Sequence, residues 1–435
     1  MKPHPTARHI RYGTAEIVVF CVITLIVIWY VVTRLILLSG PKMCIDSYTY
    51  LSDLELLKQG HPGIWRTPAY LLLIWGSKSI VSGNLWWIPL YVFQTLLFLT
   101  SVICFHDVCR RLISNRRVIS LVFTVLYSVW PPLLFYGQWM LPDFMCASLG
   151  VIYFKSLLDD ATADSWWQPV YTGVLVIILI AFKPIFIYLI AVTAIWWIWI
   201  YRRHRVSATL LSVSLSMMVL ASGLALAYRA WNNKANGYNV LTIATVVNDW
   251  MNLSLSRGIN PDEIENPELR QAAVEALEIS RQYSGIDAPW NFSVHLSTTL
   301  PDESMKYLRS DKLRHPDNVV RYFFNHLADM AYGEIARNGL DITNAFSRIY
   351  LTSPLMFLMT LAWVGMMLFR SGQCEAYPDF QTMVALSVIV MITINAYGAY
   401  GDWYRLLLPS FPEALWLGAV TVRAFLTVKR NEPAI

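Results

Sequence analysis

QPVYTGVLVIILIAFKPIFIYLIAVTAIWWIWIY, the stretch from Gln168 to Tyr201, holds a single charged side chain, Lys183. Soluble domains carry about 25% charged residues. An apolar run of this length is therefore not typical of a soluble fold. A helix of about 20 apolar residues is enough to cross the hydrocarbon of a bilayer. The stretch therefore predicts two membrane helices, near 168–182 and 184–201, broken at Lys183-Pro184.

The whole chain has the same character. Of its 435 residues, 56% are hydrophobic and 14% are charged, and its mean hydropathy is +0.45. Apolar runs of spanning length predict about ten membrane helices. The others are expected near 15–38, 86–105, 118–136, 143–158, 207–228, 353–369, 380–397 and 404–424. No small-residue cleavage site follows the first run, so it is interpreted as a retained helix. We predict an all-α polytopic membrane protein.

Lys and Arg gather on one side of the predicted bundle. They follow the second, sixth and last spans, as Arg110, Arg111, Arg116, Arg117, Arg202, Arg203, Arg205, Lys429 and Arg430. Basic residues favour the cytoplasmic side, so this side and both termini are expected to be cytoplasmic. The acidic turn of Asp159, Asp160 and Asp164 lies there too, but acids weigh little in this rule. The net charge is +5, but the cations lie in short clusters beside apolar runs, so no nucleic-acid partner is expected.

Two segments are expected to face outward, and they set the domain organisation. The predicted parts are an N-terminal transmembrane module, 1–228, with its outer loop 39–85; a mostly helical extracytoplasmic domain, 229–352; and C-terminal transmembrane helices, 353–435. In the outer loop, Asp46 to Lys58 has an apolar stripe typical of a helix in the membrane interface. The stretch 68–80 is a second such helix or an early start of the next span. Helices are expected at 267–283 and 321–335 of the outer domain.

Ionisable side chains at membrane depth are costly and are therefore functional candidates. On the predicted topology, six from distant parts of the chain meet at the outer face: Asp46, Arg66, Asp143, Lys183, Asp402 and Arg405. Structural roles remain open for several. Asp46 and Asp143 could cap helix N-termini, Arg66 could extend to lipid head groups, and Arg405 could anchor a span. Lys183 is costly in an apolar hairpin unless it is solvated or paired.

The order of these features resembles the GT-C superfamily, especially the branch of bacterial aminoarabinose transferases and protein O-mannosyltransferases. The matching motifs are, in order, DSYTYL after the first span, RTPAYLLLIW, CRRLISNRR, YSVWPPLLFYGQWMLPDFMCASLGVIYF, AFKPIFIYL and YRLLLPSFP. The resemblance covers roughly residues 1–200 and the C-terminal region, but not 229–352. The family usually has Glu where this chain has Asp143, and mannosyltransferases have an adjacent acidic pair where it has Asp46.

The resemblance implies a GT-C-like transmembrane bundle with interfacial helices, in a bacterial inner membrane, with its active site facing the periplasm. It implies a polyprenyl-phosphate-linked sugar donor and transfer with inversion to a lipid, glycan or protein acceptor. Asp46 is the expected general base, and Asp143 is expected to orient the acceptor or a cation. The side chains expected at the donor phosphate are Arg66, Lys183 and Arg405. Those expected near the substrates are Tyr48, Asp53, His61, Asp402 and Tyr404.

Elementary chemistry agrees with one base and several cations. A glycosidase needs two carboxyl groups because its leaving alkoxide must be protonated. A lipid phosphate leaves as a stable anion, so one ionised carboxylate suffices to take the acceptor proton, and Lys or Arg can hold the phosphate. No cofactor or metal is expected, although Asp46 and Asp143 together could hold a hard divalent cation.

Other classes of membrane protein remain open. A transporter or flippase of lipid-linked sugars would also carry intramembrane charges, but the sequence has one broken helix pair and no internal repeat. A glycan polymerase or ligase would use a lipid-linked oligosaccharide. A non-enzymatic scaffold would not need acids and bases converging on one face. The sequence does not identify the sugar, the acceptor or the polyprenyl lipid.

Overall fold

The computed structural model describes residues 13–37, 40–114, 116–204, 206–285, 287–333, 351–369, 377–398 and 403–431. Within these ranges the chain is helical, and no β-strand occurs. The protein is therefore all-α, as predicted.

The helices follow one another closely along the chain. They are α1 (Thr14–Leu37), α2 (Ile45–Lys58), α3 (Pro68–Ile80), α4 (Ile88–Leu112), α5 (Arg117–Ser128), α6 (Pro131–Tyr136), α7 (Asp143–Asp160), α8 (Trp167–Phe182), α9 (Tyr188–His204), α10 (Ala208–Asn236), α11 (Ala244–Ser256), α12 (Pro267–Ser280), α13 (Asp287–Thr299), α14 (Pro301–Arg314), α15 (Pro316–Ala328), α17 (Thr352–Phe369), α18 (Pro378–Gly398), α19 (Trp403–Leu406) and α20 (Phe411–Asn431). Short helical turns lie between them at η1 (Gly83–Leu85), η2 (Pro184–Ile187), η3 (Pro261–Glu263), η4 (Asp329–Gly333) and η6 (Leu408–Ser410).

Among the described residues, five helices are long and apolar enough to cross a membrane. They cover Gly83–Leu112, Arg117–Tyr136, Pro184–Arg203, Ala208–Asn236 and Pro378–Gly398. Shorter apolar helices occur at Glu16–Tyr30, Trp167–Phe182 and Thr352–Leu368, where further spans are expected. These helices indicate a membrane protein, and the number of ten spans stays a prediction.

Proline decides where several helices begin and end. The run 118–136, expected as one span, is divided between α5 and α6 because Trp130, which precedes Pro131, takes an extended conformation. The last predicted span, 404–424, is divided as well. Its main helix, α20, begins only at Phe411, after α19 and the proline-containing turn η6. The stretch 68–80 is a helix of its own, α3, and η1 separates it from α4.

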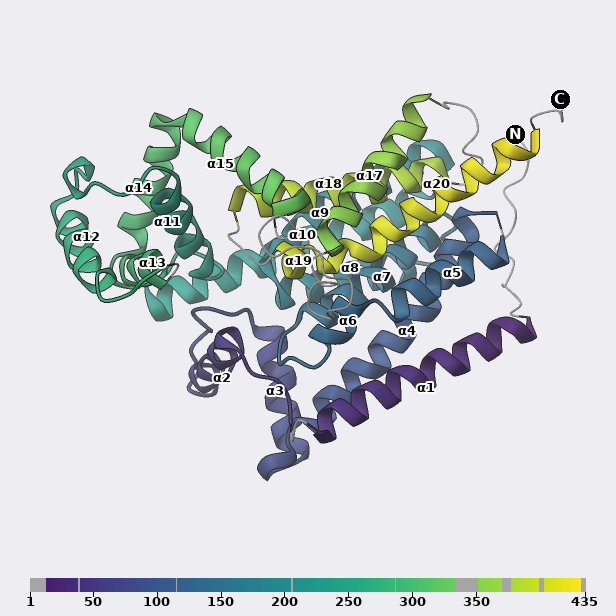
Figure 1. Ribbon diagram of the computed structural model, residues 1–435, viewed down its shortest axis with the longest axis horizontal. Coiled ribbons are helices and arrows are strands. Elements are labelled where there is room, and N and C mark those ends of the chain that lie inside the picture. The colour runs from purple at the N-terminus through teal and green to yellow at the C-terminus, as the bar shows by residue number, and fades with distance from the viewer. Residues whose placement is uncertain are drawn as a thin grey trace.

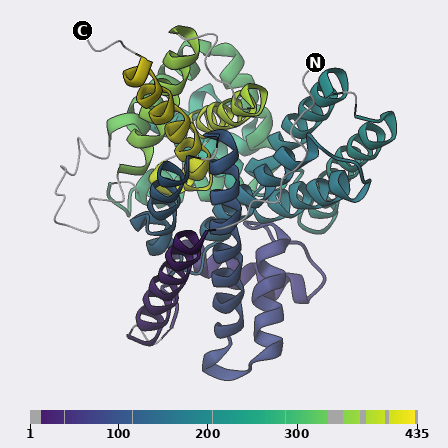
Figure 2. The same cartoon turned by 90° about the vertical axis from the view of Figure 1, so that its right-hand side faces the viewer.

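The helices form an elongated molecule whose bundle lies at one end (Figure 1). The helices α1, α4, α5 and α20 pack against one another in the half away from α11–α14, and α1 begins and α20 ends there (Figures 1 and 2). Aromatic rings join three of these helices: Phe105 of α4 stacks on Tyr127 of α5 and on Trp416 of α20, with ring centroids 4.7 and 5.2 Å apart. This packing ties the C-terminal helix to the N-terminal module.

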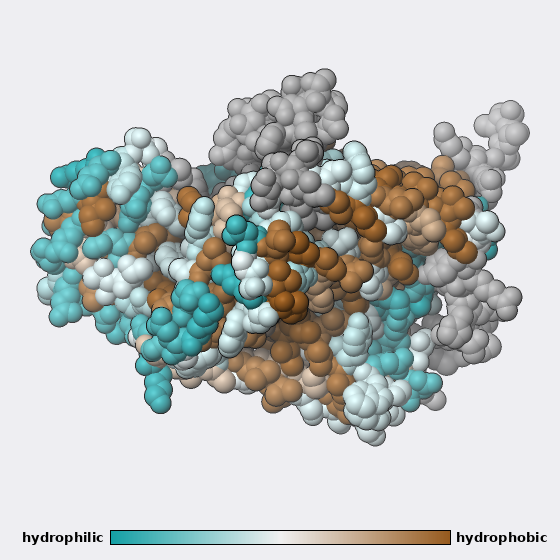
Figure 3. Space-filling view, turned by 90° about the horizontal axis from the view of Figure 1, so that it is seen from below, coloured by the Kyte–Doolittle hydropathy of each residue, from teal (hydrophilic) through white to brown (hydrophobic). Residues whose placement is uncertain are grey.

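A second core, separate from that of the bundle, holds α11–α14 together. Trp250 of α11 is fully buried and packs against Phe292 of α13 and Tyr307 of α14, with ring centroids 5.9 and 5.4 Å apart. Figure 3 shows hydrophilic side chains gathered over this end of the molecule and apolar side chains over the bundle. The region 239–315 is thus a helical unit with its own core, built within the segment expected to form the outer domain.

The long helix α10 carries this unit. It continues to Asn236, beyond the predicted end at 228, and its last turns are polar. Asn232 donates to the Val240 carbonyl oxygen (2.9 Å), and Asn236 donates to that of Pro62 (3.0 Å). The end of α10 therefore contacts both the second core and the loop after α2.

One acid of the turn at the end of α7, Asp159, is neutralised by basic side chains. Asp159 pairs with Arg111 (2.6 Å) and with Lys155 (2.5 Å), and Arg111 also pairs with Asp107 (2.8 Å). Asp159 therefore does not oppose the basic clusters that predict the cytoplasmic side, because it forms part of the same ion-pair network as Arg111.

Candidate functional site

Two segments that each carry a candidate acid are joined by their main chains. The N–H of Lys42 donates to the Gln138 carbonyl oxygen (3.0 Å), and the N–H of Met140 donates to that of Lys42 (3.1 Å). Asp46 follows Lys42 at the start of α2, and Asp143 follows Met140 at the start of α7. The pairing fixes both helix N-termini at the same end of the bundle.

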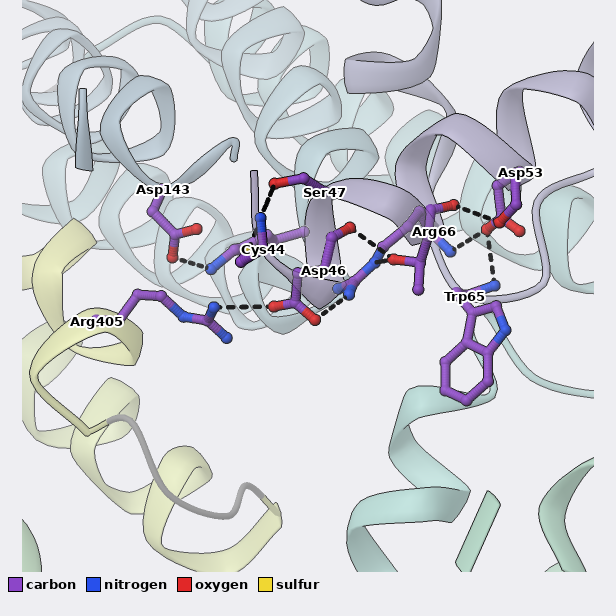
Figure 4. A network of polar contacts seen from close by, with 11 residues as sticks. Cys44, Asp46, Ser47, Asp53, Trp65, Arg66, Asp143 and Arg405 are labelled. Carbon is purple, nitrogen blue, oxygen red and sulfur yellow. Dashed lines mark hydrogen bonds and ion pairs between the residues drawn. The ribbon is translucent and has the colours of Figure 1, made fainter. Parts of the chain in front are cut away.

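Asp46 lies in the first turn of α2, where the helix dipole favours a negative charge. The N-cap is Cys44, whose N–H donates to the Ser47 hydroxyl (3.1 Å), so Asp46 does not cap the helix. Its carboxylate binds two cations instead: Oδ1 accepts from Arg66 Nη2 (2.5 Å), and Oδ2 lies 2.9 Å from Arg405 Nη1 (Figure 4). Both oxygens of Asp46 are therefore engaged.

Arg66 is directed into this cluster. Besides Asp46, its guanidinium donates through Nε to the Thr49 hydroxyl (2.7 Å) and lies over the Tyr50 ring, 4.8 Å from the centroid. Its side chain is 19% exposed. The alternative that Arg66 only extends to lipid head groups does not fit a guanidinium held by an anion, a hydroxyl and an aromatic face.

The loop that carries Arg66 is held from behind by Asp53. Asp53 Oδ2 accepts from the main-chain N–H groups of Trp65 (2.8 Å) and Arg66 (2.7 Å), and the residue is only 1% exposed (Figure 4). The Tyr228 hydroxyl of α10 lies 3.3 Å from the carbonyl oxygens of Gly63 and Arg66. Asp53, expected near the substrate, thus holds the main chain of the loop that carries Arg66.

Lys183 and Asp143 form a second ion pair. The residue before a proline is driven out of the helical conformation, and Lys183, before Pro184, is accordingly extended. Its ammonium donates to Asp143 Oδ1 (2.5 Å), and the Asp143 side chain is 3% exposed. Pro142 is the N-cap residue of α7, so Asp143 pairs with Lys183 rather than capping the helix. The pairing explains how an apolar hairpin tolerates a lysine.

The two ion pairs belong to one site. Figure 4 draws the Asp143 pair beside the Asp46 pair, and both carboxylates lie close enough to Tyr50 to act electrostatically on its hydroxyl. The Thr67 hydroxyl donates to the Phe182 carbonyl oxygen (3.1 Å), which joins the Arg66 loop to the residue before Lys183. Asp46, Arg66, Asp143, Lys183 and Arg405, predicted from the sequence to meet at one face, do meet there.

The cations make Asp46 a strong acid. Burial raises the pKa of Asp46, but the guanidinium groups of Arg66 and Arg405 outweigh it and lower that pKa to about 2. Burial also raises the pKa of Asp53, to about 6, although its hydrogen bonds from main-chain N–H groups act in the opposite direction. Asp46 is therefore ionised at neutral pH, but while both arginines bind it, it is a weak base.

The remaining candidates are either exposed or outside the described side chains. Tyr48 is 62% exposed and His61 is exposed. Asp402 lies outside the described residues, and so does the Tyr404 side chain, although its backbone belongs to α19. Across the described part of the chain, no group of three or more His, Cys, Asp or Glu side chains is placed to hold a metal ion.

Several residues around Arg66 are not evident from the sequence. Thr49 and Tyr50 occupy the α2 face that carries Asp46, and their helical spacing could have revealed them. Gly63 and Tyr228 gave no local signal. Gly63 is needed because a Cβ there would lie 2.5 Å from the Arg66 carbonyl oxygen and 2.8 Å from Asp53 Oδ2.

No protein-family model matches this sequence, and no curated protein matches it.

Proposed function

We propose that this protein is an inverting glycosyltransferase that moves a sugar from a polyprenyl-phosphate donor to an acceptor hydroxyl. The observation that carries the proposal is the Asp46 carboxylate, bound by Arg66 and Arg405 and flanked by the Asp143–Lys183 pair. One base beside several cations is what displacement of a phosphate requires, because the leaving group needs charge stabilisation rather than a proton.

The proposed step balances atoms and charge. The acceptor hydroxyl gives its proton to Asp46, and its oxygen attacks the anomeric carbon opposite the phosphate. The bond from the anomeric carbon to the phosphate oxygen breaks, and its electron pair stays on the phosphate, which leaves as a lipid monoester. The attack from the opposite side inverts the configuration of the anomeric carbon.

A charge count supports this assignment. Among the described side chains, the cluster combines three cations with two carboxylates, which leaves one surplus positive charge. A phosphodiester donor has one negative charge and neutralises that surplus. After transfer, Asp46 holds the acceptor proton and the lipid monoester carries close to two negative charges. The sum is again near zero, so the cluster suits both the donor and the product.

Asp143 and Lys183 have a supporting role in this scheme. Because Asp143 is almost fully buried and bound to Lys183, we assign it to the orientation of that ammonium. Lys183 then contributes a compact positive charge toward the phosphate, while each planar guanidinium can bind a phosphate through two parallel N–H donors.

The proposed setting is a GT-C-like bundle of about ten spans in a bacterial inner membrane. The cluster lies at the end of the bundle opposite Arg110 and Arg111, which lie at the end of α4. By the positive-inside rule the cluster then faces the outside. We propose that the polyprenyl tail lies against the apolar helices and that α11–α14 select a lipid, glycan or protein acceptor.

The test is sugar transfer by the purified protein in lipid nanodiscs. Labelled sugar is followed from polyprenyl-phosphate donors to added acceptors, and wild type is compared with Asp46→Asn and Glu55→Gln. Glu55 is the matched control because it lies on the same helix but is exposed and pairs only locally with Lys58. We expect wild-type transfer, an unchanged rate for Glu55→Gln, and a loss of about a hundredfold to ten-thousandfold for Asp46→Asn. Equal transfer by wild type and Asp46→Asn would remove Asp46 as the base.

A further inference from the structure

We infer that Asp46 competes with the lipid phosphate for Arg66 and Arg405, so that the site binds a polyprenyl phosphate monoester most tightly when Asp46 is uncharged. The inference takes its ligand class from the proposed function and adds the order of events at that site. It says that release of the lipid product depends on Asp46 giving up the acceptor proton.

The first observation is that Asp46 already occupies the anion position. Its two oxygens bind two different guanidinium groups, one from the loop after α2 and one from α19. Arginine binds carboxylate and phosphate through the same fork of N–H donors. A phosphate that is to use these donors must therefore displace the carboxylate or share the donors with it.

The second observation is that Asp143 binds Lys183, so it does not take the place of Asp46 as the anion that binds the two arginines. Its Oδ1 binds Lys183 (2.5 Å), and its side chain is 3% exposed. Among the described residues, the charged and titratable groups that face Asp46 are Arg66 from the loop, Arg405 from α19, Tyr50 from α2 itself and, beside them, the Asp143–Lys183 pair. Asp53 binds main-chain N–H groups behind Arg66. Of the described carboxylates, Asp46 is the direct competitor.

The balance between Asp46 and the phosphate changes during the proposed reaction. Before transfer, the carboxylate and the singly charged donor share the arginines. After transfer, Asp46 carries the acceptor proton, and the arginines are left to the monoester, which has nearly two negative charges. Loss of the proton to water, which can reach the 25% exposed Asp46 side chain, restores the carboxylate. The carboxylate then draws the arginines back and weakens binding of the product. Deprotonation of Asp46 is therefore the step that expels the lipid phosphate.

The experiment measures binding of sugar-free polyprenyl monophosphate to the full-length protein in nanodiscs, with no acceptor present. We expect Asp46→Asn to bind this lipid at least about tenfold more tightly than wild type, because the competing charge is gone. Glu55→Gln should bind it as wild type does, since that carboxylate is exposed and pairs with Lys58. Neutral polyprenol, which lacks the phosphate, should bind all three proteins alike.

Two results would overturn the inference: unchanged or weaker binding of the monophosphate by Asp46→Asn, or an equal gain for polyprenol. Asp46→Ser serves as a second uncharged variant. The binding constant is taken from whichever variant keeps the wild-type melting temperature. If wild type transfers sugar but the variant does not bind the monophosphate more tightly, the proposed competition is wrong and the transferase proposal stands. Tighter binding by the variant without transfer by wild type would support the competition and count against the transferase.

Discussion

Arg66 and Arg405 bind opposite oxygens of a single carboxylate, that of Asp46, although they come from opposite ends of the chain. Arg66 follows α2, and Arg405 lies in α19, before the last long helix, α20. The C-terminal helices are therefore part of the site and do more than complete the bundle. It also follows that the chemistry of Asp46 depends on where the two guanidinium groups point.

Replacing Arg66 by lysine should reduce sugar transfer although the charge is kept. The guanidinium uses Nη2 for Asp46 and Nε for Thr49 at the same time, and its plane lies over Tyr50. An ammonium is a point charge and cannot reproduce this fixed fork. We expect kcat/KM for transfer to fall by about tenfold or more with little change in melting temperature. A wild-type rate in Arg66→Lys would mean that the planar geometry is not used.

The Lys183–Asp143 pair should show strong coupling in a double-mutant cycle of thermal stability. Lys183→Met leaves a carboxylate that is 3% exposed without its cation, and removing one partner of a buried pair costs about 3–5 kcal/mol. The double variant Asp143→Asn, Lys183→Met should recover most of this loss. The exposed pair of Lys58 and Glu55 is the control, where Lys58→Met should change stability by less than about 1 kcal/mol. Equal losses in both pairs would contradict the assignment.

Sequence patterns predicted the charged cluster well because each member has a strong local signal. Asp46 follows the first span, Lys183 interrupts an apolar run before a proline, and Arg405 lies in a polar turn before an apolar helix. Membrane depth makes such residues conspicuous. What the sequence could not supply is which cation meets which acid, since that depends on contacts between segments far apart in the chain.

The missed features depend on main-chain geometry. Asp53 is expected near the substrates, but its side chain lies on the face turned toward the loop, where it accepts hydrogen bonds from main-chain N–H groups. Likewise, the double proline after Trp130 divides an apolar run that has the length of a single span. Hydropathy is insensitive to both effects, because it averages over the residues of a window.

The buried Asp53 carboxyl predicts a dependence of stability on pH. Its pKa is raised from 3.8 to about 6, so the folded protein binds this proton more tightly than the unfolded chain does. The resulting stabilisation is present below about pH 4 and is lost as the pH rises through about 6; its size is about 3 kcal/mol. Asp53→Asn keeps an oxygen acceptor for Trp65 and Arg66 but cannot titrate.

We therefore expect the difference in melting temperature between Asp53→Asn and wild type to shift in favour of the variant between about pH 4 and pH 7. Melting curves in detergent at several pH values measure it. A difference that is constant over this range would show that Asp53 does not titrate there.

Gly63→Ala should damage the site through sterics alone. A Cβ at Gly63 would lie 2.5 Å from the Arg66 carbonyl oxygen and 2.8 Å from Asp53 Oδ2. The first of these atoms belongs to the main chain and cannot rotate away, so the loop that carries Arg66 must move. Overpacking of this kind costs about 1–3 kcal/mol, and the displaced guanidinium should also lower the transfer rate.

Gly76→Ala is the matched control for this substitution. Gly76 lies in α3, and a Cβ there would meet nothing within 4 Å. Alanine should stabilise that helix by up to about 1 kcal/mol. The two alanine variants should therefore move the melting temperature in opposite directions, and only Gly63→Ala should slow transfer and weaken donor binding. If Gly63→Ala lowered stability but left the kinetics of transfer unchanged, the position of Arg66 would not depend on this loop, and its contact with Asp46 would have to be maintained by Thr49 and Tyr50.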